Sequence, residues 1–105
     1  GAEYLGEYYP NHPVIQNFWN VFNVFDMTNK KKFLVFLTGT DRVPITGIRS
    51  LKIKIQPVSG GVNNEHLPVA HTCFNLLDLP RYPTKEMMKQ KVEQAISYSS
   101  GFGLA

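Results

Sequence analysis

Near the start of the chain, large apolar side chains recur every three or four residues, a spacing that leaves the segment little choice of structure. An α-helix places residues with this spacing on one face, whereas a strand alternates its side chains between two faces. Pro13 fits the first turn of a helix, where its missing N–H is not needed. The pattern therefore predicts a helix over about residues 13–25, with Trp19 and Phe22 largely buried. Its apolar face would consist of Val14, Ile15, Phe18, Trp19, Phe22 and Phe25.

A second helix is predicted to follow and to end near Thr38. Asp26 or Thr28 can cap its first turn, and Gly39 suits its C-terminal end. The apolar run at residues 33–37 would also fit a buried strand, because a short run has no clear period. The caps at both ends favour the helix. Its core-facing residues would be Phe33, Leu34 and Leu37.

The middle of the chain is predicted to contain loops and two extended segments. Residues 3–10 form a lead-in segment, and residues 39–50, with two glycines and a proline, form an ordered loop. Apolar and polar residues alternate strictly over residues 51–56, which indicates a strand with one solvent-exposed face. Residues 72–79 are a second extended candidate, closed by a proline.

The last predicted element is a third helix. Thr84 can cap a helix over about residues 85–98, and we expect a flexible tail at residues 101–105. With 105 residues the chain has room for one core, so residues 1–105 are expected to form a single domain. The predicted order is helix, helix, strand, strand, helix: a small α/β (α+β) domain with its helices packed on a short β-sheet.

Composition excludes several classes of protein. Eleven Lys and Arg against eight Asp and Glu give a net charge of +3, too small and dispersed to predict a nucleic-acid partner. The longest apolar run, residues 33–37, is far shorter than the roughly 20 residues that span a bilayer. One cysteine can form neither an intrachain disulfide nor a four-cysteine zinc site. The expected protein is a soluble domain of a reducing compartment, with no membrane partner.

Residues 66–75 carry the only cysteine, Cys73, and two of the three histidines. If the segment is extended, His71 and Cys73 point to the same face, where an imidazole would raise the thiolate fraction of the thiol. On the residues alone three interpretations stay open. Cys73 could be a buried inert residue, which is the commonest use of a lone cysteine, or a nucleophile. It could also bind a metal with His66 and His71, and Asp78 as a fourth ligand.

Two further features are less specific. A protease-like set of Cys73, His12 and Asn75 can be drawn, although His12 at a helix start fits a neighbour of the cap better than a catalytic base. Phe102 lies between two glycines, and a large apolar residue is unusual in a fraying chain end. It could fold back into the core or act as an apolar hook for another domain.

Several separate motifs occur in collinear order over nearly all of the chain. They are Asn11-His12-Pro13, Phe18-Trp19, Thr38-Gly39-Thr40-Asp41-Arg42-Val43-Pro44, Leu67-Pro68-Val69-Ala70-His71-Thr72-Cys73-Phe74-Asn75, Leu77-Asp78-Leu79-Pro80-Arg81-Tyr82 and Gly101-Phe102-Gly103-Leu104. Together they resemble the catalytic C-terminal lobe of HECT-type ubiquitin ligases. The Gly-Phe-Gly ending is closer to the E6-associated-protein and RCC1-containing branches than to the WW-domain branch. The resemblance implies the fold of that lobe, without the N-terminal lobe on which the family docks the conjugating enzyme.

The resemblance also implies roles for single residues. Cys73 would accept ubiquitin from a conjugating enzyme as a thioester and pass it to a substrate lysine. Thr72 would hydrogen-bond near the thioester carbonyl, and His71 would tune the thiolate. Leu67 would lie where the family binds ubiquitin, and Phe102 would serve isopeptide formation.

The same resemblance implies no cofactor: neither a metal, a nucleotide nor an organic group is required. The expected partners are ubiquitin, a ubiquitin-conjugating enzyme and protein substrates. The expected location is the cytoplasm, with the nucleus as a second compartment. The alternative function is a lobe that binds ubiquitin without catalysis, and the thiol in its expected context favours the enzyme.

Overall fold

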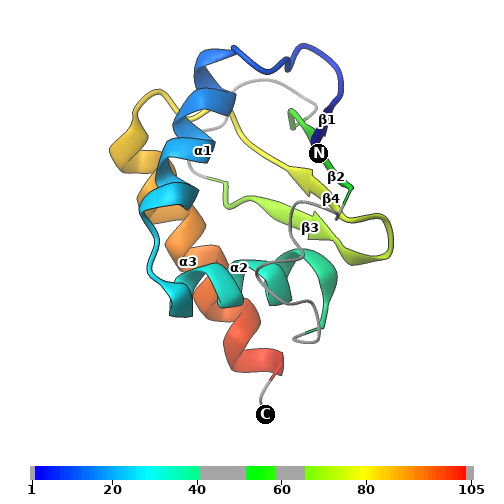
Figure 1. Cartoon of the computed structure of the whole chain (residues 1–105), viewed down its shortest axis with the longest axis vertical. Helices are drawn as coiled ribbons and strands as arrows, with labels where there is room; N and C mark the ends of the chain where they lie inside the picture. The colour runs from blue at the N-terminus through cyan, green and yellow to red at the C-terminus, as the bar shows by residue number, and fades with distance from the viewer. Residues whose placement is uncertain (1, 41–51, 59–65, 104–105) are drawn as a thin grey trace.

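The computed structural model describes residues 2–40, 52–58 and 66–103, with side chains described as far as Tyr98. Within these ranges the chain folds into helices that pack beside a four-stranded sheet (Figure 1). This is the mixed α/β architecture that the sequence predicts. No helix in the described ranges has both the length and the apolar character needed to cross a bilayer.

Three helices and four strands are described. The helices are α1 (Pro13–Val24), α2 (Met27–Thr38) and α3 (Lys85–Gly103). The strands are β1 (Ala2–Tyr4), β2 (Ile53–Gln56), β3 (Val69–His71) and β4 (Leu76–Asp78). A short 3-10 turn, η2 (Thr72–Phe74), joins β3 to β4.

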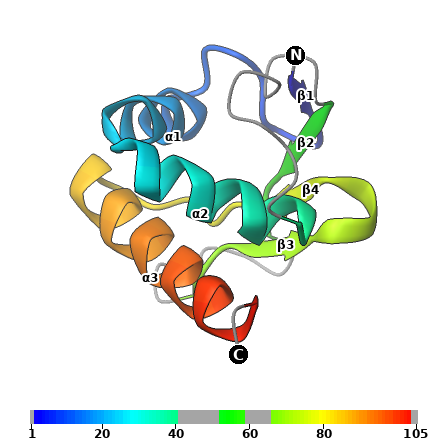
Figure 2. The same ribbon diagram turned by 60° about the horizontal axis from the view of Figure 1, so that its bottom comes forward.

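The sheet has the strand order β1-β2-β4-β3, in which β1, β2 and β4 run parallel and β3 runs antiparallel to β4 at the edge. One face of the sheet points into the hydrophobic core and contributes Ile53, Ile55 and Leu77 to it. The helices pack on one another and cover this face (Figure 2). Alternate residues such as Lys54 and Gln56 belong to the other face and keep partial contact with solvent.

Aromatic rings from α1 and α2 make the centre of the core. The ring of Phe33 lies 5.6 Å from that of Phe18 and 5.3 Å from that of Phe22, measured between centroids, and all three side chains are buried. The prediction of buried residues is confirmed for Phe22, which is buried, and Trp19 is partly buried against the core. Trp19 packs at the margin of the core, and its indole N–H donates to the hydroxyl of Tyr4, 3.1 Å away.

The predicted helix ends are confirmed at three positions. Asp26 rather than Thr28 caps α2, with its side chain accepting from the backbone N–H of Asn29 at 2.8 Å. Gly39 ends α2 in the left-handed conformation, with φ of 78°. The side chain of Thr84 accepts a hydrogen bond in the first turn of α3.

Other boundaries differ from the predictions. The lead-in segment contains a strand, β1, which hydrogen-bonds to β2 and so belongs to the sheet. The predicted strand at residues 51–56 begins only at Ile53, and the loop at residues 39–50 lies outside the described residues from 41 onward. Helix α3 continues to Gly103 instead of ending near residue 98, so residues 101–103 are helical and not an irregular tail.

Candidate active site

A tight turn presents the only cysteine. The predicted extended segment at residues 72–79 is confirmed at β4 and wrong at residues 72–75, where the chain leaves β3 at His71, passes through η2 and returns as β4. Asn75 reverses the chain with φ of 51°, a left-handed conformation that asparagine tolerates better than most residues. The carbonyl of Asn75 accepts from the backbone N–H of Lys54 at 3.0 Å, which ties the turn to β2.

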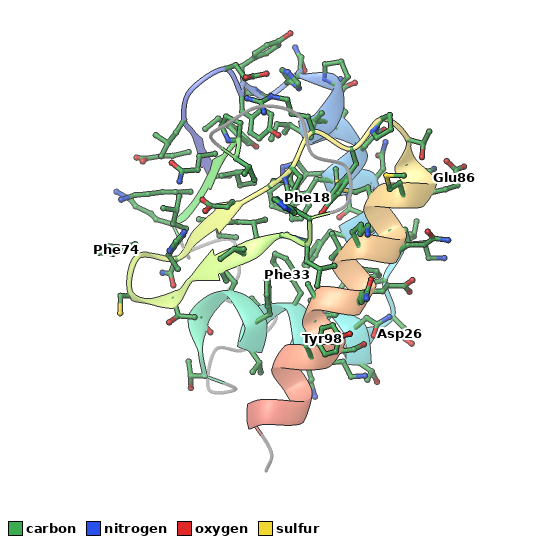
Figure 3. The ribbon with its side chains drawn as sticks, turned by 180° about the vertical axis from the view of Figure 1, so that it is seen from behind. Phe18, Asp26, Phe33, Phe74, Glu86 and Tyr98 are labelled. Atoms are coloured by element: carbon green, nitrogen blue, oxygen red, sulfur yellow. The ribbon has the colours of Figure 1, made fainter. Side chains whose placement is uncertain are left out.

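The thiol of Cys73 is free and exposed in the middle of this turn. The interpretation of Cys73 as a buried apolar residue is therefore wrong. Its neighbour Phe74 is 67% exposed although it is large and apolar, and Figure 3 shows it at the outer end of the hairpin. Both side chains are thus available to another molecule.

Thr72 begins the turn and links it to the end of α2. A Cβ placed on Gly39 would lie 3.4 Å from the Cβ of Thr72, so the side chain of Thr72 packs against the backbone of Gly39. Gly39 from one motif and Thr72 from another, far apart in the sequence, therefore lie side by side next to Cys73. The sequence placed Thr72 in the candidate site but gave no sign of this contact with α2.

His71 is held by a carboxylate from the neighbouring strand. Its Nε2 lies 2.8 Å from Oδ2 of Asp78, and Oδ1 of Asp78 accepts from Nε2 of Gln56 at 2.6 Å. The expectation that His71 and Cys73 share a face of one strand is wrong, since the strand ends at His71. Gln56 was not among the predicted site residues. The alternation in residues 51–56 places Gln56 on the solvent-exposed face of its strand, but only the strand order brings Gln56 beside Asp78.

The metal interpretation is not supported. Among the described residues, which include His66, His71, Cys73 and Asp78, no group of three His, Cys, Asp or Glu side chains could hold a metal ion. Asp78 instead serves as the hydrogen-bond partner of His71.

His12 is engaged at the start of α1. Its Nδ1 accepts from the backbone N–H of Val14 at 3.1 Å, so His12 is itself the cap of α1. Its ring also packs edge-on against the rings of Tyr8 and Tyr9. These contacts favour the capping role over the protease-like set.

An open apolar groove lies beside the turn and contains Leu67. Its volume is about 350 Å³, and it runs between α2, β3 and α3. Tyr98, which Figure 3 labels on α3, is 57% exposed at its wall. The lining residues are Phe36, Leu67, Pro68, Ala70, Thr72, Ala95 and Tyr98.

Two buried tyrosines anchor the segments that carry the site. The hydroxyl of Tyr82 donates to the carbonyl of His66, just before β3, and burial raises the pKa of Tyr82. The hydroxyl of Tyr8 donates to the carbonyl of Leu79 at 2.6 Å, and burial raises the pKa of Tyr8 to about 12. Both hydroxyls therefore remain protonated donors at neutral pH.

The remaining predicted site residue, Phe102, lies in the last turn of α3, and its side chain is outside the described residues. The structure thus brings together Leu67, His71, Thr72 and Cys73 around one hairpin.

The fold and the exposed thiol agree with a match over the whole chain. Residues 1–105 match the family described as HECT-domain (ubiquitin-transferase). The chain therefore belongs to the HECT-domain family, which confirms the resemblance seen in the motifs.

The chain is also similar to individual proteins that are named ubiquitin ligases. A human protein named Probable E3 ubiquitin-protein ligase HERC4 is 55% identical over 103 residues, which are 98% of this chain and 10% of that relative. Human Probable E3 ubiquitin-protein ligase HERC3 is 51% identical over 104 residues, 99% of this chain and 10% of the relative. The E3 ubiquitin-protein ligase UPL6 of Arabidopsis thaliana is 43% identical over 109 residues, which cover 99% of this chain and 11% of that relative. The chain spans about a tenth of the length of these relatives.

Proposed function

We propose that this chain is the catalytic C-terminal lobe of a HECT-type ubiquitin ligase and that Cys73 carries ubiquitin as a thioester. The observation that carries the proposal is the free, exposed thiol at the outer turn of the β3–β4 hairpin, in a chain of a ubiquitin-transferase family. A nucleophile that must meet a second protein needs this exposure, whereas an inert cysteine is usually buried.

The proposed reaction consists of two acyl transfers. The thiolate of Cys73 attacks the carbonyl that joins ubiquitin to a conjugating enzyme, and the thiolate of that enzyme leaves. A lysine amine then attacks the new thioester, the C–N bond forms, and the thiolate of Cys73 leaves. Thr72, next to the nucleophile, is proposed to hydrogen-bond near the thioester carbonyl. His71 is proposed to act on the thiol from the end of β3.

Ubiquitin itself is the proposed occupant of the surface beside the turn. Leu67 and Thr72 line one groove, so a protein bound there would lie next to Cys73. The other proposed partners are a ubiquitin-conjugating enzyme, which would dock on an N-terminal lobe, and protein substrates. The cytoplasm, and the nucleus as a second compartment, are the proposed locations, where a lone thiol stays reduced.

Phe102 is proposed to act in the second transfer only. In a complete catalytic domain, Phe102→Ala should leave thioester formation at Cys73 nearly normal and should slow transfer to lysine. Single-turnover assays of the two steps would check this. Equal losses in both steps would indicate a folding role instead.

The test of the whole proposal uses a chimera in which this chain replaces the matching residues of the 55% identical human relative. Incubation with ubiquitin-charged conjugating enzyme should give an adduct one ubiquitin heavier, which reducing agent removes. Cys73→Ser should give an adduct that resists reducing agent, or none. Binding of ubiquitin without any adduct would favour the alternative, a non-catalytic ubiquitin-binding lobe.

A further inference from the structure

The outer face of the sheet brings three polar side chains into one chain of hydrogen bonds beside the Cys73 turn. In the parallel pair of β2 and β4, Gln56 lies directly opposite Asp78. In the antiparallel pair of β3 and β4, Asp78 lies opposite Val69, and His71 is two residues farther along β3 on the same face. Residues opposite each other in a sheet, and their diagonal neighbours, point to one side. The contacts follow from this register.

The distances identify strong hydrogen bonds. The 2.6 Å from Nε2 of Gln56 to Oδ1 of Asp78 and the 2.8 Å between Oδ2 of Asp78 and Nε2 of His71 are typical of bonds to a charged acceptor. Both oxygens of the carboxylate are used, one for each partner. The side chain of Asp78 is 21% exposed and that of His71 is 44% exposed, so the pair is partly shielded from water.

This arrangement determines which nitrogen of His71 carries the proton. A carboxylate only accepts hydrogen bonds, so Nε2 of His71 must be the donor. In a neutral imidazole the other nitrogen, Nδ1, then has a free lone pair. His71 precedes η2 but makes no side-chain cap bond to it, and Nδ1 has no hydrogen-bond partner among the described residues. An acceptor nitrogen is thus available two residues before Cys73.

We propose that Asp78, oriented by Gln56, is a positioning residue that holds His71 as its Nε2–H tautomer and thereby presents Nδ1 as a proton acceptor for acyl transfer at Cys73. The inference rests on the proposed function and adds a proton acceptor to it. An attacking amine forms a C–N bond to the carbonyl carbon, the C–S bond to Cys73 breaks, and the sulfur leaves as a thiolate. The proton lost by the amine passes to Nδ1, and Asp78 stabilises the imidazolium that results. In this arrangement His71 is the base and Asp78 is the group that orients it.

The first test is spectroscopic and needs no ubiquitin. Nitrogen-15 NMR of the imidazole of His71 in this chain should show a protonated Nε2 and an unprotonated Nδ1. Asp78→Ala should turn this signature into a mixture of tautomers. Glu7→Ala is the matched control, because it removes a carboxylate from another surface pair, in which Nε of Arg81 donates to Glu7 at 2.9 Å. The control should leave the signal of His71 unchanged.

The second test measures the chemistry. Each chain is loaded using ubiquitin whose C-terminus is a small-molecule thioester, and its discharge to free lysine is then followed at equal loaded fractions. Asp78→Ala should slow discharge by about 10²-fold, the lower range for general acid–base catalysis, and Glu7→Ala should not. Melting curves identify any variant that fails to fold, and for such a variant Gln56→Ala replaces Asp78→Ala, with slower discharge still expected.

The outcomes separate the two proposals. Failure of the wild-type chain to load would contradict the proposed function and leave the tautomer result standing. An unchanged tautomer, or an unchanged rate of discharge in a folded Asp78→Ala chain, would overturn the role of Asp78. Asp78→Ala could also lower the melting temperature and change neither the tautomer nor the rate of discharge. The Gln56–Asp78–His71 contacts would then only stabilise the hairpin, and the proposed role of Asp78 would be overturned.

Discussion

The aromatic core under α1 and α2 and the hairpin that carries Cys73 use similar residues in opposite ways. In the core, Phe18 is 1% exposed and packs against other rings. In the hairpin, Phe74 is 67% exposed and Cys73 is free. Burial of apolar area stabilises the first region, whereas backbone hydrogen bonds and a left-handed asparagine shape the second. The comparison teaches that the buried residues that stabilise this small fold and the exposed residues of the candidate site lie in separate parts of it.

The largest expected effect comes from the same substitution made in both regions. Phe18→Ala should lower the free energy of unfolding by about 3–5 kcal/mol, because it leaves a cavity in a close-packed core. Phe74→Ala should change it by less than about 0.5 kcal/mol, as is usual for an exposed side chain. Chemical denaturation followed by circular dichroism measures both. Similar losses in the two variants would break the comparison.

A change inside the hairpin should affect chemistry more than stability. Thr72 is exposed and next to Cys73, so Thr72→Ala should slow thioester formation by about 10²-fold, the typical loss for one misplaced contact. Its melting temperature should stay close to that of the wild type. Single-turnover loading with ubiquitin thioester gives the rate. A normal rate would remove Thr72 from the site.

A smaller effect is expected where the two regions meet. Gly39 has φ of 78°, a conformation that costs other residues about 1–2 kcal/mol, so Gly39→Ala should destabilise the fold by about that amount. Gly6→Ala is the control, because Gly6 has φ of 62° and its missing Cβ would face Pro57 instead of Thr72. Urea denaturation should show comparable losses in the free energy of unfolding for Gly39→Ala and Gly6→Ala. No loss at Gly39 would contradict the left-handed end of α2.

Alkaline pH should weaken the anchoring of the hairpin. Burial raises the pKa of Tyr8 from 10.0 to about 12 in the folded chain, so the folded state favours the protonated hydroxyl. This contribution to stability is fully present below pH 10 and is lost as the pH rises through about 12. Melting temperatures from pH 8 to 12 should fall in that window. In Tyr8→Phe the melting temperature should fall less over this pH range, because the variant lacks the hydroxyl that titrates.

The helices could be predicted because their signals are local. The three- and four-residue spacing around Phe18, and the caps at Asp26, Gly39 and Thr84, act within a few residues of chain. The hydrogen bond from the indole N–H of Trp19 to Tyr4 could not be predicted in this way, because it joins α1 to a strand that the pattern of residues 3–10 does not reveal.

The hairpin could be predicted only in part. Cys73, His71 and Thr72 stand out by residue type, but the turn at Asn75 breaks a segment whose composition reads as extended. The pairing of His71 with Asp78 depends on strand register, and that of Asp78 with Gln56 depends on strand order, which no local pattern encodes. Long-range geometry therefore completes a site that the sequence only outlines.

The most direct test of the account is the intact mass of this chain after incubation with ubiquitin that carries a small-molecule thioester at its C-terminus. The wild-type chain should gain the mass of one ubiquitin and lose it on treatment with reducing agent. Cys73→Ala should gain nothing while keeping the wild-type melting temperature, because Cys73 is exposed and contributes little to packing. A reducible ubiquitin adduct on the Cys73→Ala chain, or none on the wild type, would contradict the assignment of Cys73 as the nucleophile.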